Sequence, residues 1–75
     1  MKISARNVLR GRVKSIKRGA VNGEVVIQVT DAIDVVASVT LASIDELGLE
    51  KGQEAYAVFK ASDTMVGTPH SKRGE

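Results

Sequence analysis

Two cations and two hydroxyl residues are the best candidates for shared chemistry in this chain of 75 residues. Binding an oxyanion requires a guanidinium or ammonium group for charge, with hydroxyls and backbone N–H groups to give direction. Arg6 precedes a strand-like run and Lys60 lies in another, while Thr40 and Ser43 stand where a helix would begin, a place where backbone N–H groups are free. Together these residues predict an oxyanion site. Taken singly, they are better explained as a surface arginine, two helix caps and a strand lysine whose amine reaches solvent.

Catalysis finds little support in the residue types present. The chain has no cysteine, which excludes disulfides, Cys-based zinc sites and thiol nucleophiles. Its single histidine, His70, lies in a C-terminal stretch without pattern and cannot by itself build a His-rich metal site. The acids fall mainly at expected turns, so no pair is held together as general acid–base chemistry requires, and the scattered glycines form no phosphate-cradling motif. We therefore expect a binding protein, not an enzyme, with no metal cation held by direct ligands.

The length of the chain corresponds to one small domain. A domain of this size buries only about 60–65% of the surface that its unfolded chain exposes, so it needs very good packing or association with other chains. Only Tyr56 and Phe59 are aromatic, and the many Val, Ile and Ala residues favour sheet surfaces that association would cover. Because the N-terminus has no apolar signal core and no segment approaches a membrane span, we expect a cytoplasmic protein without a membrane partner.

The formal net charge is +2, but the positive charge is concentrated before the first acid, Glu24. Such a run raises nucleic acid as an alternative partner for an OB-type domain. The aromatic residues of a single-strand stacking platform are missing from this segment, and solvated strand faces with edge-protecting charges explain it equally well. The cations of this run are Lys2, Arg6, Arg10, Arg12, Lys14, Lys17 and Arg18.

Alternation of apolar and polar residues predicts strands over residues 8–17, 20–30, 33–40 and 53–65. Ile16 breaks the alternation of the first strand, which predicts a bulge near Lys14 and Ser15. Asn22-Gly23 is the strongest hairpin signal, although the reversal could instead lie at Gly19, with a bulge early in the second strand. Several short strands, tight turns and one short helix predict an all-β fold, a small OB-like Greek-key barrel.

A change of period to three residues over residues 41–49 predicts one or two turns of helix. Thr40 or Ser43 can cap its start, and Gly48 suits the left-handed position after its end. The last strand is apolar on both faces as far as Lys60, which predicts a strand covered on both sides. A lysine there must reach solvent or be paired.

An ordered set of short motifs resembles the molbindins, or Mop proteins, small molybdate- and tungstate-binding proteins of TOBE type. The resemblance covers about residues 1–67, which we take as one domain, and excludes residues 68–75, which we expect to be a flexible tail. It is carried by Ser4-Ala5-Arg6-Asn7, Leu9-x-Gly11-x-Val13, Gly19-x-Val21-x-x-Glu24-Val25, Ser38-Val39-Thr40, Ser43-Ile44-x-x-Leu47-Gly48-Leu49, Gly52 and Lys60-Ala61-Ser62-x-x-Met65-Val66.

The resemblance implies an OB-like barrel that binds molybdate or tungstate between the subunits of a homohexamer, a trimer of dimers with exchanged strands and termini. It implies ligands Ser4, Ala5 and Arg6 from one chain. From a neighbouring chain it implies Thr40, Ser43, Lys60 and Ala61, and since alanine replaces the serine of some relatives, Ala61 could donate only its backbone N–H. A second site class near the three-fold axis would involve Gly19, Ala20 and Val21. The function that these features imply is molybdate or tungstate storage.

Overall fold

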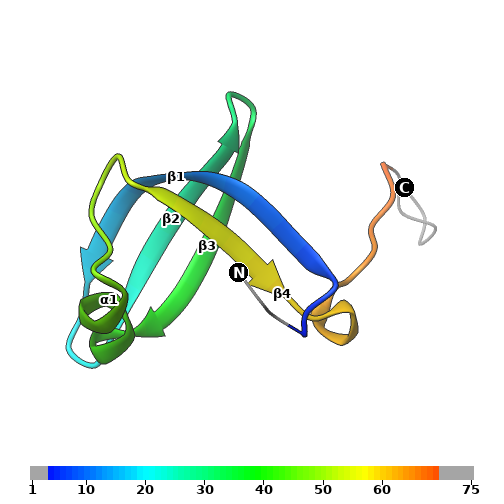
Figure 1. Cartoon of the computed structure of the whole chain (residues 1–75). Coiled ribbons are helices and arrows are strands. Elements are labelled where there is room, and N and C mark those ends of the chain that lie inside the picture. The colour runs from blue at the N-terminus through cyan, green and yellow to red at the C-terminus, as the bar shows by residue number, and fades with distance from the viewer. Residues whose placement is uncertain (1–3, 70–75) are drawn as a thin grey trace.

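A single curled antiparallel sheet forms the frame of the protein (Figure 1), and the computed structural model describes residues 4–69. Along the chain the sheet strands, the helix and a final 3-10 turn follow in the order β1 (Asn7–Arg18), β2 (Asn22–Thr30), β3 (Ile33–Thr40), α1 (Leu41–Leu47), β4 (Glu54–Phe59) and η1 (Ala61–Asp63). In space the strands are ordered β3-β2-β1-β4. Two hairpins are followed by a strand that returns beside the first, which is Greek-key connectivity. The predicted all-β fold with one short helix is confirmed.

Strand β1 pairs with β4 along its first half and with β2 along its second half, and the two antiparallel ladders meet at Arg12. Arg12 lies opposite Gln28 of β2 and also opposite Glu54 of β4. A Cβ atom on Gly11 would lie 2.4 Å from the backbone carbonyl oxygen of Gln28, so only glycine fits at this crossing. The register between β1 and β2 shifts between Val13 and Ser15, which confirms the predicted bulge.

The reversal between β1 and β2 lies at Gly19, not at Asn22-Gly23. The Gly19 N–H donates to the Asn22 carbonyl at 2.8 Å, and Gly23 is already paired regularly with Arg18 inside the ladder. The predicted Asn22-Gly23 hairpin is therefore wrong, and the alternative reversal is right, without a bulge at Gly23. Gly23 serves packing instead, because a Cβ there would lie 2.6 Å from Cδ1 of Ile44.

Helix α1 closes one end of the curled sheet. Thr40 is its N-cap and Gly48 has a left-handed φ of 61°, both as predicted. The N–H groups of Gly48 and Leu49 donate to the carbonyls of Asp45 and Ile44, a Schellman ending that stops the helix at Leu47, directly before the predicted left-handed glycine. Ile44, 1% exposed, packs in the core with Val13 and Val25 from the sheet, together with Ile27 and Ala57.

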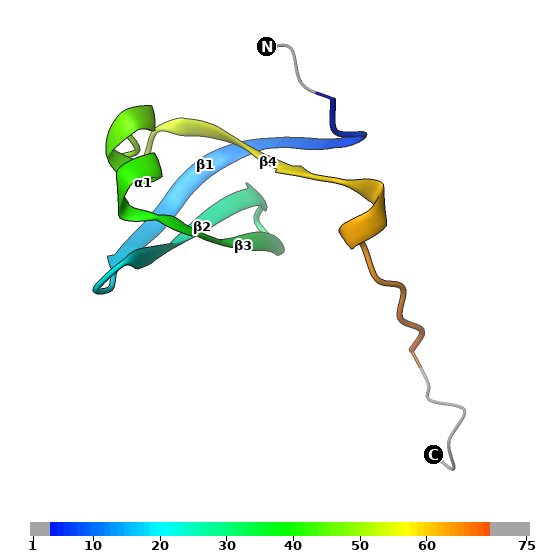
Figure 2. The same ribbon diagram turned by 90° about the horizontal axis from the view of Figure 1, so that it is seen from below.

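Strand β4 is shorter and less covered than predicted. It ends at Phe59, because the Asp63 N–H donates to the Lys60 carbonyl and curls the chain into η1. Tyr56 and Val58 are exposed, so within one chain the strand is not covered on both sides. Strands β3 and β4 lie at the two free edges of the sheet; the barrel is open between them (Figure 2).

Candidate functional site

A small pocket lies where the N-terminal segment enters the sheet. The pairing of Asn7 with Phe59 places the residues before β1 against the residues that follow β4. The pocket has a volume of about 410 Å³, and it is lined by Ser4, Ala5, Val58, Phe59, Lys60 and Asp63. Three of the residues predicted to bind an oxyanion, Ser4, Ala5 and Lys60, therefore come together within a single chain.

Lys60 is held by the turn that follows it. Its carbonyl accepts hydrogen bonds from the Asp63 N–H at 3.0 Å and from the Thr64 hydroxyl at 3.3 Å, which fixes its backbone, while its side chain is exposed. Within residues 4–69 its ammonium group forms no ion pair. Ala61 is the first residue of η1, next to the pocket. The resemblance places Lys60 and Ala61 in a neighbouring chain, whereas these contacts bring them to Ser4 and Ala5 of their own chain.

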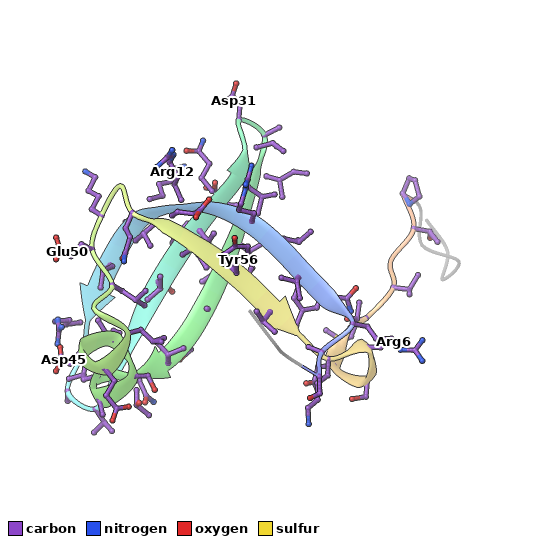
Figure 3. All side chains as sticks on the ribbon, viewed as in Figure 1. Arg6, Arg12, Asp31, Asp45, Glu50 and Tyr56 are labelled. Carbon is purple, nitrogen blue, oxygen red and sulfur yellow. The ribbon has the colours of Figure 1, made fainter. Side chains whose placement is uncertain are left out.

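Arg6 lies beside the pocket but does not line it. Its side chain extends away from the sheet at the end that also carries η1 (Figure 3). In the described part of the chain the Arg6 guanidinium has no hydrogen-bond or ion-pair partner. This charge is thus available at the rim of the pocket.

Thr40 and Ser43 lie at the opposite end of the sheet, at the start of α1 (Figures 1 and 2). The Ser43 N–H donates to Thr40 Oγ1 at 3.1 Å, and the Thr40 hydroxyl donates to Ser43 Oγ at 2.9 Å. The Ser43 hydroxyl proton is the one that these bonds leave free to donate. Within one chain, Thr40 and Ser43 therefore lie far from Arg6 and Lys60.

The turn assigned to a second site class, formed by Gly19, Ala20 and Val21, lies at the same end as α1. The Val21 carbonyl accepts a hydrogen bond from the Leu41 N–H at 3.0 Å, while the Val21 side chain is 71% exposed. The structure thus brings this turn next to the start of α1, where Thr40 and Ser43 lie, and not next to Lys60.

The remaining cations of the N-terminal run are mostly engaged within the chain. Arg10 pairs with Glu54 and Lys14 with Asp34, at 3.6 and 2.8 Å, and Arg18 pairs with Asp45. The Arg12 guanidinium donates to the Gly52 carbonyl at 3.2 Å. These exposed contacts add little stability, but they offset the positive charge that suggested nucleic acid. Arg6 and Lys60 differ from them in having no such partner among residues 4–69.

Asp63, Val58 and Phe59 line the pocket, although the sequence did not single them out as site residues. The signal that could have found Asp63 is its spacing of three from Lys60, which brings two residues together in a 3-10 turn. Residues 4–69 contain no group of three or more His, Cys, Asp or Glu side chains able to hold a metal ion. No helix in that range combines the length and the hydropathy of a membrane span.

A family model and known proteins match almost the whole length of this fold. The TOBE domain model matches residues 3–66. A probable molybdenum-pterin-binding protein from Haemophilus influenzae is 51% identical over 67 residues, which is 89% of this chain and 97% of that protein. The chain belongs to the molbindin (Mop) family of TOBE-domain proteins.

Two solved Mop-type structures share the fold. MopII from Clostridium pasteurianum is 39% identical, with a TM-score of 0.83 over 89% of this chain and all of that chain. The cytoplasmic molybdate-binding protein ModG, in a crystal form with molybdate bound, is 43% identical. Its TM-score is 0.85 over 92% of this chain and 49% of that chain, so one copy of this chain corresponds to half of ModG.

Proposed function

We propose that this protein binds molybdate, and that it stores the anion in the cytoplasm without catalysing a reaction on it. The observation that carries the proposal is the ammonium of Lys60 in a pocket with Ser4 and Ala5, next to the guanidinium of Arg6; neither cation has an ion-pair partner among residues 4–69. A tetrahedral dianion needs positive charge and several directed donors. The pocket offers the charge of Lys60 and the Ser4 hydroxyl, and Ala61, whose backbone N–H is a further candidate donor, follows Lys60 directly. The relative ModG has been crystallised with molybdate bound, which supports molybdate as the anion. Tungstate has the same charge and shape, and we expect it to bind as well.

A single chain supplies only part of the proposed site. The start of α1, with Thr40 and Ser43, lies at the far end of the sheet from η1 (Figure 1), which Lys60 directly precedes. Their hydroxyls can therefore reach an anion at Lys60 only from another copy. We therefore place the anion between subunits, with Ser4, Ala5, Arg6, Lys60 and Ala61 on one side. The other side of this site is the start of α1 in a neighbouring chain. The turn next to α1, formed by Gly19, Ala20 and Val21, is the candidate for a separate, second anion site.

The open barrel supports such an assembly. A groove of about 430 Å³ runs along the inner side of the sheet, with Val39, Leu47 and Tyr56 among its lining residues. Met65 and Val66 follow η1 and are each 92% exposed. Exposed apolar side chains and an unfilled apolar groove complement each other. We propose that the segment 64–66 of one chain enters the groove of the next, within a homohexamer built as a trimer of dimers.

Calorimetric titration of the purified protein with molybdate, tungstate and sulfate tests the proposed function. We expect tight binding of molybdate and tungstate and much weaker binding of sulfate. Since sulfate carries the same charge, cavity size and donor placement would have to discriminate against it. Arg6→Ala and Lys60→Ala should each weaken molybdate binding at least tenfold. Lys51→Ala, which removes an exposed lysine from a turn distant from the pocket, is the matched control and should change nothing. Molybdate affinity that survives both site substitutions would place the site elsewhere.

A further inference from the structure

Asp63 is a carboxylate in a pocket that otherwise suits an anion. Among residues 4–69 it is the one acidic residue that lines the pocket, where it faces the same cavity as Lys60, Ser4 and Ala5. A carboxylate repels a bound oxyanion, so its position there is unfavourable for binding and calls for a physical account.

The position of Asp63 is set by η1 and not by an ion pair of its own. Its N–H donates to the Lys60 carbonyl at 3.0 Å, which keeps the two residues in one turn, yet their charged groups do not form a salt bridge. Asp63 is exposed, and the carboxylate accepts no hydrogen bond from another side chain of residues 4–69. The negative charge is therefore not neutralised locally, and it acts on whatever anion enters the pocket.

We propose that Asp63 is a specificity-determining residue that weakens oxyanion binding in proportion to the charge of the anion. This inference rests on the proposed function. Among residues 4–69, the charges at the pocket and its rim are Arg6, Lys60 and Asp63, which sum to +1, less than the charge of a dianion. Repulsion by the Asp63 carboxylate weakens the binding of every anion and so favours its release. It weakens the binding of dianions more than that of monoanions, since Coulomb energy scales with the charge of the ligand.

The test compares Asp63→Asn with the wild-type protein, using molybdate and the tetrahedral monoanion perrhenate as probes. We expect the substitution to tighten molybdate binding about 3- to 10-fold at low ionic strength, with the gain falling when salt is raised, because exposed charges are screened. The gain for perrhenate should be close to the square root of the gain for molybdate, since the ligand has half the charge. A purely structural effect of the substitution would not produce this ratio.

Asp31→Asn is the matched control, because it removes the same charge from the β2–β3 turn, away from the pocket (Figure 3). It should leave both affinities unchanged, which separates a local effect from the change in net charge. If wild-type protein binds molybdate and Asp63→Asn binds it equally or less well, this inference is wrong and the proposed function stands. If neither protein binds molybdate, the proposed function itself fails.

Discussion

Thr40 and Ser43 are joined by two hydrogen bonds that leave one hydroxyl proton unused. Thr40 Oγ1 accepts from the Ser43 N–H at 3.1 Å, as a helix cap, and its own proton goes to Ser43 Oγ at 2.9 Å. The two residues thus have different roles despite their similar chemistry. Thr40 stabilises the start of α1 and orients its neighbour, and Ser43 presents the free donor.

The first prediction follows from this division of roles. Ser43→Ala removes the free donor, and because a hydrogen bond to a charged group contributes about 1.5–3 kcal/mol, molybdate affinity should fall at least tenfold with little change in stability. Thr40→Val removes a cap and should cost about 1 kcal/mol of stability, as well as affinity. Titration and thermal unfolding of both variants provide the measurement, with Thr40→Ser as the control that retains cap and donor. Equal affinity in Ser43→Ala and wild type would contradict the role of Ser43.

Mixed oligomers test which residues meet across the subunit boundary. Arg6→Ala and Ser43→Ala each damage every site of their own homo-oligomer. If the two residues reach one anion from different chains, a mixed dimer contains one site with both substitutions and one site with neither. Co-refolded protein should therefore recover a fraction of intact, high-affinity sites, measurable by titration. If the mixture shows no high-affinity sites, both residues act from the same chain.

The same experiment with Arg6→Ala and Lys60→Ala gives the opposite expectation. These residues lie at one end of one chain, with Lys60 in the pocket that Ser4 and Ala5 line. A mixed oligomer then contains only sites that lack one cation or the other, so high-affinity binding should not return. Recovery of intact sites would instead support the arrangement that the family resemblance implies, with Lys60 supplied by the neighbouring chain.

How far the sequence predicted this fold depends on whether local or distant contacts decide each feature. The bounds of β3 and the caps at Thr40 and Gly48 were predictable, because alternation and capping are local properties. The reversal at Gly19 was not assigned uniquely, because Asn22-Gly23 is a local hairpin signal, whereas Gly23 is required by contact with Ile44, 21 residues later.

The arrangement of the candidate site residues was only partly predictable. Residue chemistry and the family resemblance selected Arg6, Thr40, Ser43 and Lys60. The resemblance groups Lys60 with Thr40, whereas a single chain places them at opposite ends of the sheet. That division depends on the pairing of β1 with β4, which brings residues before Asn7 to those after Phe59. Asp63 was missed because its place in the pocket depends on η1, where the sequence pattern suggested a continuous strand.

Association through the exposed segment 64–66 gives a prediction about subunit number. Val66→Asp introduces a charge that would be buried in an apolar groove, and burial of an unpaired charge is strongly unfavourable. We expect native mass spectrometry to show monomers or small species for this variant where wild type shows hexamers. Val66→Ile, which keeps the apolar surface, should retain the wild-type mass. A hexamer of normal stability in Val66→Asp would rule out this segment as the contact.

The crossing at Gly11 gives a prediction about stability. A methyl group there would lie 2.4 Å from the Gln28 carbonyl oxygen and 2.9 Å from Cγ2 of Ile27, so β1 would have to move away from β2. Overpacking of this kind costs about 1–3 kcal/mol of stability. Because the closest atom belongs to the backbone, we expect the loss for Gly11→Ala to lie at the upper end of this range. Denaturant unfolding measures the loss. Gly67→Ala is the control, because among residues 4–69 a methyl group there would have no neighbour within 4 Å apart from the adjoining residues of the chain. Equal stability of the two variants would show that β1 can relax at the crossing.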